Sequence, residues 1–447
     1  MTKKQVVVIG GGPAGVEAAL AAAGGDTAVT LISAERVGGR AGWHSLLPSK
    51  VWLNAADSIG AAAHHRAVSG GQSLAVSAEV VTAHIKGVKE AWNGRLAEKV
   101  QAAGVTVVHG TAEFTDAHTV TITPPEGTPI SLQADTFIVA AGSVPIFPPG
   151  LKPDGKRVIA PRFASALNTL PASIVVVGGG ATGTEFAYLF NQLGTAVTWV
   201  VDEQGILPDF APAVGQAVGR IFQKRGVRLV AGQRAQQIDR DEAGVIVQLA
   251  DGTQLEAGMA FVAVGRKPDV GKLNLAAAGV ALSGETAVTN DYGQSTTPHI
   301  YLVGDVSGGP MVANRAMEQA WIAGRHAAGL PVRPFVAEHV VAAVYCEPQA
   351  AQVGRMQGDD LEQVAVPLAE SLKGALVADE GFVKMAFYPE NGRIAGAAAV
   401  APHAADLLTP VMVAMRAGLT MAEFSQMFAA HPTLSELLFA AARQVVG

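Results

Sequence analysis

The sequence predicts an α/β fold that contains two similar β-α-β units. The first observation is a pair of related segments, VVVIGGGPAGVEAA from Val6 and IVVVGGGATGTEFA from Ile174. In each segment a β-branched run leads into Gly-x-Gly-x-x-Gly and then into an alanine-rich stretch typical of a helix. The second observation is a further strand about twenty residues on, which is VTLIS from Val29 and VTWVV from Val197. One such glycine pattern is a weak indication, but two in full context predict two Rossmann-like dinucleotide-binding domains.

Composition sets the bounds within which these units fit. A chain of 447 residues exceeds one ordinary core and should divide into two to four domains. Hydrophobic residues make up 49% and charged residues only 16%, against a usual value of about 25% charged, which suggests a large buried surface that includes a subunit interface. The net charge of −6 and the absence of a basic stripe argue against nucleic acid as a partner.

The first strand begins almost at once, because MTKKQVVVIGGG enters an apolar run without a signal-peptide cleavage site. The longest uncharged stretch, 163–184, contains polar residues and glycines and is a poor membrane span. We therefore expect no transmembrane segment. The whole chain has one cysteine, so a reducing cytoplasmic location is the default expectation.

The glycine loops have a physical rationale. The first glycine of each loop permits a tight turn, the second lets backbone N–H groups approach a pyrophosphate, and the third lets the helix pack close to the strand. The helix N-terminus then offers positive potential to the phosphates. These glycines are Gly10, Gly12 and Gly15 in the first loop, and Gly178, Gly180 and Gly183 in the second. Two bound dinucleotides are therefore expected.

The residues expected to bind the two riboses are less regular. The strand VTLIS ends at Ser33, where an acidic residue is usual, and Glu35 follows two residues later. A neutral hydroxyl should bind a ribose more weakly than a carboxylate does. The strand VTWVV ends at Val201 and is followed by Asp202, with no Arg or Lys from 198 to 207. This pattern argues against a 2′-phosphate and predicts that NADH is preferred over NADPH.

Beyond the two loops, a series of segments resembles the FAD-dependent pyridine nucleotide-disulfide oxidoreductases, the family of dihydrolipoamide dehydrogenase, glutathione reductase and mercuric reductase. The resemblance runs through nearly the whole chain. The segments are AAGSVPIFPP (140–149), VGRKPD (264–269), TTPHIYLVGD (296–305), GPMVANRAMEQ (309–319), YCEPQAAQVG (345–354), GFVKMAFYPENGRIAGAAAV (381–400) and HPTLSE (431–436).

The resemblance implies a domain organisation. An FAD-binding domain would span 1–150 and 281–333, an NAD(P)-binding domain 151–280, and a C-terminal α+β dimerisation domain 334–447. The last domain would build a two-fold homodimer in which each active site takes residues from both subunits. Independently of the resemblance, 381–400 is typical of two short strands around the turn Pro389-Glu390-Asn391-Gly392, which suits a hairpin.

The resemblance also implies cofactor-binding residues. Asp305 corresponds to the aspartate that hydrogen-bonds the ribityl chain of FAD in the family. The other positions expected at the two dinucleotide sites, besides the loop glycines, Ser33, Glu35 and Asp202, are Gly39, Ala112, Gly142, Gly265 and Ala313. No metal site is expected.

The segment GGRAGWHSLLPSK (38–50) departs from the family at the position of its chemistry. Family members carry a redox-active pair in the pattern C-x-x-x-x-C, and the corresponding residues here are Ala41 and Leu46. The only cysteine, Cys346, lies about 300 residues away, and an isolated cysteine is more often a small buried hydrophobic residue than a nucleophile. Lys50 and Glu185 remain, and the resemblance implies that they pair beside the flavin.

His431 and Glu436 fall in HPTLSE, a segment identical to the family's C-terminal motif. In the family, a histidine held by glutamate acts as acid and base for the partner subunit's disulfide, as an imidazole that titrates near neutrality can. Two interpretations stay open here. The pair is either an interface element or a proton donor to another reducible group, since a two-electron acceptor such as a quinone also needs protons.

These observations predict an FAD-dependent NAD(P)H oxidoreductase that cannot use a C-x-x-x-x-C disulfide. Hydride would pass from NAD(P)H to FAD and then to a small non-disulfide acceptor such as a quinone, in an apolar pocket lined by Ala41, Trp43 and Leu46. Trp43 and His44 would contact this acceptor or simply fill the volume of the missing disulfide. Pyridine nucleotide transhydrogenation is one alternative. A non-catalytic flavin-binding homologue, or an electron-transfer subunit that serves a partner protein, is another.

Overall fold

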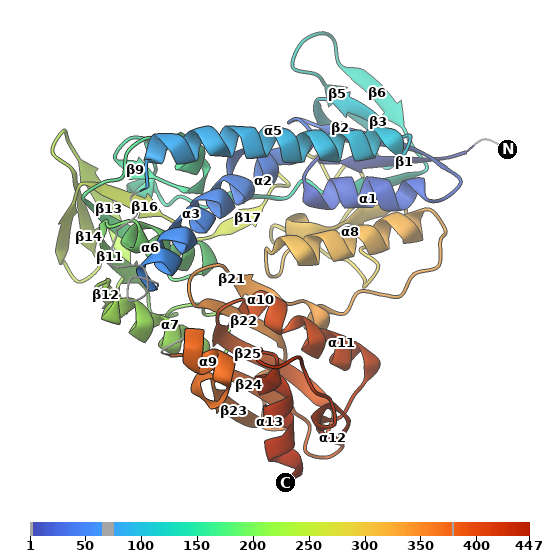
Figure 1. The fold of residues 1–447 in the computed structure, drawn as a ribbon. Helices are drawn as coiled ribbons and strands as arrows, with labels where there is room; N and C mark the ends of the chain where they lie inside the picture. Colours follow the sequence, from blue (N-terminus) through green and yellow to red (C-terminus); the bar gives the residue numbers. More distant parts are fainter. Residues whose placement is uncertain (1–2, 65–75, 378–379) are drawn as a thin grey trace. The chain divides into compact units, whose positions relative to one another are not determined.

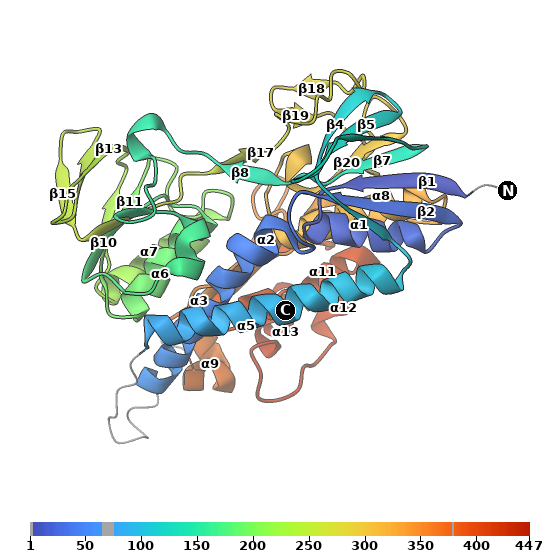
Figure 2. The same cartoon turned by 90° about the horizontal axis from the view of Figure 1, so that it is seen from above.

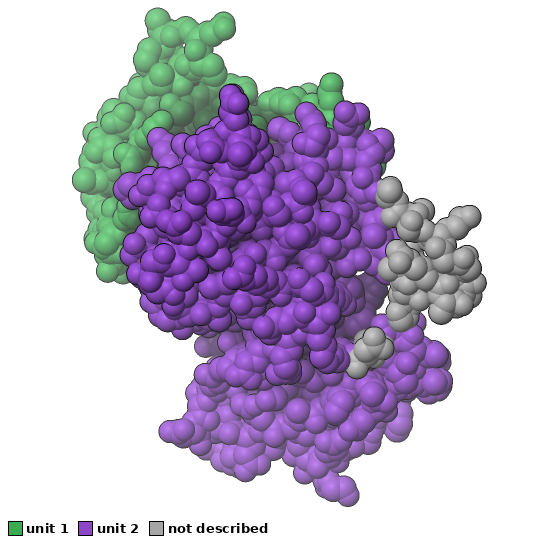
Figure 3. Space-filling view, turned by 90° about the vertical axis from the view of Figure 1, so that its left-hand side faces the viewer, with its two compact units in different colours: residues 1–49, 82–146, 265–336 green, residues 50–81, 147–264, 337–447 purple. Residues whose placement is uncertain are grey.

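The computed structural model describes residues 3–64, 76–377 and 380–447. The chain divides into two compact units, each made of three stretches that are distant in sequence (Figure 3). Unit 1 comprises 1–49, 82–146 and 265–336, and unit 2 comprises 50–81, 147–264 and 337–447. Each unit contains one of the two glycine loops.

Unit 1 is built on a parallel five-stranded sheet with the order β20-β7-β1-β2-β3. Alternate residues of β1 face two different cores, as the pleat of a strand requires. Val6 and Val8 pack with α1 and α8, whereas Val7 and Ile9 pack on the opposite face with β4 and β5. The strands are β1 (Lys4–Ile9), β2 (Thr27–Ser33), β3 (Thr106–His109), β4 (Thr111–Asp116), β5 (Thr119–Thr123), β6 (Ile130–Gln133), β7 (Thr136–Val139) and β20 (Ile300–Leu302).

Helices α1 (Pro13–Ala23) and α8 (Ala313–Ala327) lie side by side on one face of this sheet (Figure 1). Their contact is so close that a Cβ atom on Gly324 would lie 2.5 Å from the carbonyl oxygen of Ala18. Alanine and glycine therefore dominate both helices at the contact, because larger side chains would force them apart. Unit 1 also contains α2 (Gly39–His44), most of α5 (Ala78–Ala102), β8 (Ser143–Pro145), β17 (Arg266–Pro268), β18 (Leu282–Ser283) and β19 (Thr286–Ala287), whereas most of α3 (Leu46–His64) belongs to unit 2.

The segment from 265 to 280 packs within unit 1. Leu273, Leu275, Ala278 and Val280 are buried in the same cluster as Phe137 of β7. The two compact units divide after 264, whereas the expected NAD(P)-binding domain ends at 280, and that domain boundary stays a prediction. The difference arises because these four apolar side chains complete the core of the first unit.

Unit 2 contains the second parallel sheet, with the order β12-β11-β10-β16-β9. Helices α6 and α7 lie beside it (Figure 2), and Phe186 of α6 stacks on Phe261 of β16 with ring centroids 4.1 Å apart. An antiparallel three-stranded sheet packs on Val175 and Val177 of β10. The elements are β9 (Val158–Ile159), β10 (Ser173–Val177), α6 (Ala181–Gln192), β11 (Ala196–Val201), α7 (Pro212–Lys224), β12 (Arg228–Ala231), β13 (Ala235–Arg240), β14 (Val245–Leu249), β15 (Gln254–Ala257) and β16 (Met259–Val262).

The C-terminal part of unit 2 is an antiparallel sheet, β21-β22-β25-β24-β23, with helices packed on it. The predicted hairpin is confirmed, since β24 and β25 pair around the turn at Gly392, which has a φ of 69°. The elements are β21 (Ala342–Val344), β22 (Gln349–Gly354), β23 (Glu362–Pro367), α9 (Leu372–Val377), β24 (Phe382–Phe387), β25 (Ile394–Ala401), α10 (Ala404–Leu407), α11 (Thr409–Ala417), α12 (Met421–Ser425) and α13 (Glu436–Val446).

This architecture confirms the predicted fold class: two Rossmann-like sheets and a C-terminal α+β region. Among the described residues, no helix is both long enough and apolar enough to cross a membrane.

Candidate active site

The first glycine loop joins β1 to α1, and its three motif glycines differ in their surroundings. Gly10 has a φ of 115°, and a Cβ there would lie 2.3 Å from the carbonyl oxygen of Ala140. A Cβ on Gly15 would lie 1.6 Å from the carbonyl oxygen of Gly10, so only glycine lets the helix start so close to the strand. Around Gly12, in contrast, a Cβ would meet no protein atom within 4 Å. Packing within the protein therefore does not require glycine at position 12.

The second loop, between β10 and α6, repeats this pattern. Gly178 has a φ of 122° and a Cβ there would lie 2.2 Å from the carbonyl oxygen of Ala263, while one on Gly183 would lie 2.0 Å from that of Gly178. At Gly180 a Cβ would again meet nothing within 4 Å. In both loops the second glycine borders open space at a helix N-terminus, which is the place where a dinucleotide pyrophosphate needs close access to the backbone. The residues present therefore fit two dinucleotides.

The expected ribose-binding residues of unit 1 lie next to the first loop. Ser33 is so close to it that a Cβ on Gly11 would lie 2.2 Å from the serine Oγ. Its hydroxyl donates to the carbonyl oxygen of Glu35 at 2.6 Å, and the Glu35 carboxylate lies 3.2 Å from Nε2 of His44. Gly39 also belongs to this region, since a Cβ there would lie 2.7 Å from the Cα of Gly12.

Asp305 is held in place by a short hydrogen-bond network in unit 1. The Ser143 hydroxyl donates to its Oδ2 at 2.5 Å, and Nε of Arg266 donates to the Ser143 Oγ at 2.8 Å. Burial lowers the pKa of Arg266 and of Arg315, an effect that the charge of Asp305 opposes. Gly142, with a φ of 76°, directly precedes Ser143. These contacts fix the orientation of the Asp305 carboxylate.

The remaining cofactor positions in this unit lie at element boundaries. Ala313 is the first residue of α8, Ala112 is buried near the start of β4, and Gly265 directly precedes β17. No charged or polar side chain is available at these three positions. Any contact with a cofactor would therefore come from their backbone groups or from the space that a small residue leaves.

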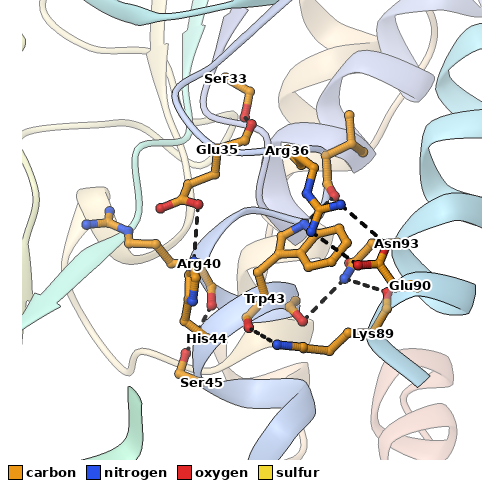
Figure 4. Close-up of polar contacts among 12 residues, drawn as sticks. Ser33, Glu35, Arg36, Arg40, Trp43, His44, Ser45, Lys89, Glu90 and Asn93 are labelled. Atoms are coloured by element: carbon orange, nitrogen blue, oxygen red, sulfur yellow. Dashed lines mark hydrogen bonds and ion pairs between the residues drawn. The ribbon is translucent and has the colours of Figure 1, made fainter. Parts of the chain in front are cut away.

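Helix α2 carries the first of the two positions where the family has cysteine, and an aromatic side chain anchors it (Figure 4). Trp43 is 6% exposed and its indole N–H donates to the carbonyl oxygen of Val37 at 2.9 Å. The guanidinium carbon of Arg36 lies 3.5 Å from the centre of the Trp43 ring, and Arg36 also pairs with Glu90 of α5. The filling role considered for Trp43 is therefore favoured over direct contact with an acceptor.

Further contacts tie α2 to α5 (Figure 4). Asn93 is 1% exposed and donates to the carbonyl oxygens of Gly42 and Lys89. The Lys89 ammonium donates to the Trp43 carbonyl oxygen at 3.2 Å. Polar contacts thus fix the segment that lacks a disulfide. At the second family cysteine position Leu46 is 39% exposed, so part of an apolar side chain stays accessible there.

Lys50 and Glu185 meet in unit 2, as the sequence predicted. The Lys50 ammonium lies 2.7 Å from the Glu185 carboxylate, whose side chain is 9% exposed. The backbone N–H of Tyr345 donates to the same carboxylate oxygen at 3.0 Å, and the ammonium lies 4.6 Å from the centre of the Tyr345 ring. The Lys50 ammonium is therefore held in place beside the buried Glu185 carboxylate.

Cys346 follows Tyr345 and is buried. Its Sγ lies 3.2 Å from the Pro348 carbonyl oxygen, and burial raises the pKa of the thiol far above its usual value. This supports the interpretation of Cys346 as a small buried residue. Burial, reinforced by the charge of Asp57, also raises the pKa of Glu347 to about 7.

His431 and Glu436 form a pair near the C-terminus, as predicted. Nδ1 of His431 lies 2.8 Å from the Glu436 carboxylate, which also accepts the backbone N–H of Thr433 at 2.8 Å. The hydrogen bond from His431, followed by that from Thr433, lowers the pKa of Glu436. The Glu436 carboxylate therefore fixes the orientation of the His431 ring through Nδ1.

The structure brings one residue next to Asp202 that the sequence did not indicate. Arg234 lies between β12 and β13 and pairs with Glu203 and, at 3.7 Å, with Asp202. The sequence pointed to Asp202 because it directly follows β11, but Arg234 lies outside the window of residues that was considered. Across the described part of the chain, no group of three or more His, Cys, Asp or Glu side chains could hold a metal ion.

Comparisons with known proteins agree with this geometry. The sequence family described as pyridine nucleotide-disulphide oxidoreductase matches residues 4–320, and the dimerisation domain of the same name matches 340–442. An NAD(P)H dehydrogenase (quinone) of Mycobacterium tuberculosis is 31% identical, with 99% of this chain and 94% of the relative covered. A dihydrolipoyl dehydrogenase of Chlorobaculum tepidum is 32% identical, with 98% and 96% covered.

Solved structures are similar over the same length. The crystal structure of LpdA from Mycobacterium tuberculosis has a TM-score of 0.93 at 30% identity and covers 99% of this chain and 100% of its own. The HOCl-induced flavoprotein disulfide reductase RclA from Escherichia coli has a TM-score of 0.85 at 22% identity, with 99% and 100% covered. At that identity the second likeness concerns the fold alone.

Proposed function

Because the chain belongs to the pyridine nucleotide-disulphide oxidoreductase family, we propose that it oxidises a nicotinamide coenzyme and reduces a small quinone. The observation that carries this proposal is the pair Ala41 and Leu46, which stand where disulfide reductases need two sulfurs, in a chain with a single buried cysteine. The name of the M. tuberculosis relative, NAD(P)H dehydrogenase (quinone), supports the same class of acceptor.

Family membership implies FAD and NAD(P)H as cofactors, and the residues present fit both. Gly12 and Gly180 leave open space at two helix N-termini, and Asp305 is oriented by Ser143. When bound, FAD supplies the two-electron chemistry that connects the nicotinamide to the acceptor. For the second site we propose a preference for NADH, because Asp202 and Glu203 place two carboxylates after β11, where a 2′-phosphate would be repelled.

We also propose that the functional form is a homodimer located in the reducing cytoplasm. The dimerisation domain matches 340–442, and within that range large apolar side chains are exposed, namely Phe428 at 83%, Val413 at 56% and Met427 at 41%. Exposed large apolar side chains within a dimerisation domain suit a subunit interface. Phe428 is three residues from His431 in the sequence, which suits a histidine that serves the partner's active site.

The overall reaction consumes one proton: NADH, H⁺ and quinone give NAD⁺ and hydroquinone. We propose that His431 delivers this proton to the reduced quinone, because Glu436 holds its Nδ1 and orients the imidazole. The apolar side chains of Ala41 and Leu46 suit a quinone ring better than they suit a charged acceptor.

Replacing His431 by Gln is expected to slow quinone reduction about tenfold to a hundredfold, within the usual range for loss of one general acid. Anaerobic flavin reduction by NADH should be unchanged, which a stopped-flow instrument resolves as a separate phase. The matched control is His84→Gln, which removes an exposed histidine of α5. Equal slowing of both phases, or of neither, would exclude His431 as the proton donor.

The proposed acceptor class is tested by steady-state NADH oxidation with benzoquinone or naphthoquinone, compared with lipoamide and glutathione disulfide. Quinones should be reduced, whereas both disulfides should be turned over at background rates, since no thiol pair can relay electrons to them. Robust turnover of either disulfide would contradict the proposal.

A further inference from the structure

The guanidinium of Arg234 lies between two carboxylates at the edge of the second dinucleotide site. Its Nε donates to Glu203 Oε2 at 3.1 Å, its Nη2 binds Glu203 Oε1, and its Nε lies 3.7 Å from Asp202 Oδ2. The contact with Glu203 is therefore bidentate. The backbone N–H of Glu203 and the charge of Arg234 hold the pKa of the Glu203 carboxyl below its usual value, so this ion pair is fully charged at neutral pH.

Strand register explains why Arg234 reaches this edge although it is distant in sequence. Strands β11 and β12 are parallel, with Val201 opposite Ala231, so the segments that follow both strands leave from the same edge of the sheet. The backbone N–H of Gln233 donates to the Val201 carbonyl oxygen at 3.1 Å, which fixes the backbone just before Arg234. Arg234 is thus anchored beside the start of the turn that carries Asp202.

That turn packs directly on the second glycine loop. The backbone N–H of Leu207 donates to the Gly179 carbonyl oxygen at 2.8 Å, and a Cβ on Gly179 would lie 2.4 Å from the Gly205 carbonyl oxygen. In a β-α-β unit of this kind, the residue after the second strand lies at the 2′ position of the adenine ribose. Asp202, Glu203 and Arg234 therefore surround the position where NADH carries a hydroxyl and NADPH carries a phosphate.

The ion pair is also easy to separate. The side chains of Arg234 and Glu203 are 58% and 61% exposed, and exposed pairs contribute little to stability because water competes for both charges. Two carboxylates against one guanidinium leave the cluster with one net negative charge. A net negative charge suits the neutral 2′-hydroxyl of NADH. The Arg234 guanidinium nevertheless stays close to that position, and a guanidinium can bind a phosphate in bidentate geometry.

We propose that Arg234 is a specificity-determining residue for the nicotinamide coenzyme, released from Glu203 and Asp202 to bind the 2′-phosphate of NADPH. The inference rests on the proposed use of a nicotinamide coenzyme by this chain. NADH remains the preferred coenzyme. NADPH can bind only when the ion pair separates, and the nearby Glu203 carboxylate then repels the 2′-phosphate. NADPH is nevertheless a working coenzyme, and Glu203 limits its use.

The test is isothermal titration of the FAD-loaded protein with adenosine 2′,5′-bisphosphate and with AMP, which differ by the 2′-phosphate alone. Arg234→Gln should weaken binding of the bisphosphate about tenfold, as expected for loss of a bidentate charged contact, and leave AMP binding unchanged. Glu203→Gln should strengthen binding of the bisphosphate severalfold, because the repulsion is removed and Arg234 is released. The control is Arg228→Gln, which removes an exposed arginine at the other end of β12.

The same variants should shift the ratio of flavin reduction rates with NADPH and NADH in the same directions. An Arg234→Gln variant that keeps the wild-type preference in both measurements would overturn the role of Arg234 while leaving the proposed function intact. Failure of the wild-type protein to bind either nucleotide, together with no flavin reduction by either coenzyme, would overturn the proposed function and this inference with it.

Discussion

Replacing Gly12 by valine is expected to give a folded protein that has lost FAD. Gly12 has a φ of −74° and a ψ of −176°, which valine can adopt, and a Cβ there would meet no protein atom within 4 Å. The added side chain would instead occupy the space next to the backbone N–H groups that a pyrophosphate needs. Loss of two charge-assisted hydrogen bonds, at about 1.5 kcal/mol or more each, corresponds to a hundredfold weaker affinity or worse, at about 1.4 kcal/mol per tenfold change.

The measurement combines the flavin absorbance of the purified protein with a thermal melt followed by circular dichroism. Gly15→Val is the contrasting variant, because its Cβ would lie 1.6 Å from the Gly10 carbonyl oxygen and should prevent the unit from folding. Gly180→Val is the matched control in the second loop, where FAD should be retained and NADH binding lost. A yellow Gly12→Val protein with full FAD content would show that this loop does not hold the cofactor.

Replacing Lys50 by Met is expected to slow anaerobic flavin reduction by NADH about a hundredfold, the size of effect seen when one preorganised electrostatic contact is removed from an active site. The Lys50 ammonium is 2.7 Å from Glu185, and we propose that it supplies positive charge where negative charge develops during reduction. Lys50→Arg should recover part of the rate because it keeps the charge. The control is Lys86→Met, which removes an exposed lysine of α5.

Stability should change as well, since the variant leaves the buried Glu185 carboxylate without its charge partner. The side chain of Lys50 is 32% exposed, so water screens part of the interaction and the expected loss is about 1–3 kcal/mol. The double variant Lys50→Met/Glu185→Gln should recover most of that stability but not the rate of flavin reduction. Recovery of both would mean that the pair is only structural, and unchanged reduction by Lys50→Met would exclude it from catalysis.

The fold was predictable because its strongest signals are local in the sequence. A β-branched run, three glycines at fixed spacing and an alanine-rich helix occur together twice, and the contacts of Gly10, Gly15, Gly178 and Gly183 show why no other residue fits there. Leu273 and Leu275, in contrast, carry no local sign in the sequence that they join the core of unit 1, and only the contacts of the folded chain place them there.

A residue of the candidate site could be predicted from the sequence when it lay in a segment that resembles the family. Lys50 and Glu185 are 135 residues apart, but each belongs to a motif and their pairing followed from the resemblance. Trp43 left two interpretations open, and only its burial and its hydrogen bond to Val37 favour the filling role. Arg234 could not be found from residues near Asp202, because strand pairing between β11 and β12 brings it there.

We propose that this member of the family passes electrons to a quinone and not to a disulfide. The most direct test reduces the FAD-loaded protein with one equivalent of NADH without oxygen and then mixes it with a naphthoquinone, lipoamide or glutathione disulfide. The flavin absorbance should return within the turnover time with the quinone and should stay bleached with both disulfides. Rapid return with lipoamide or glutathione disulfide, or none with any quinone, would contradict the account.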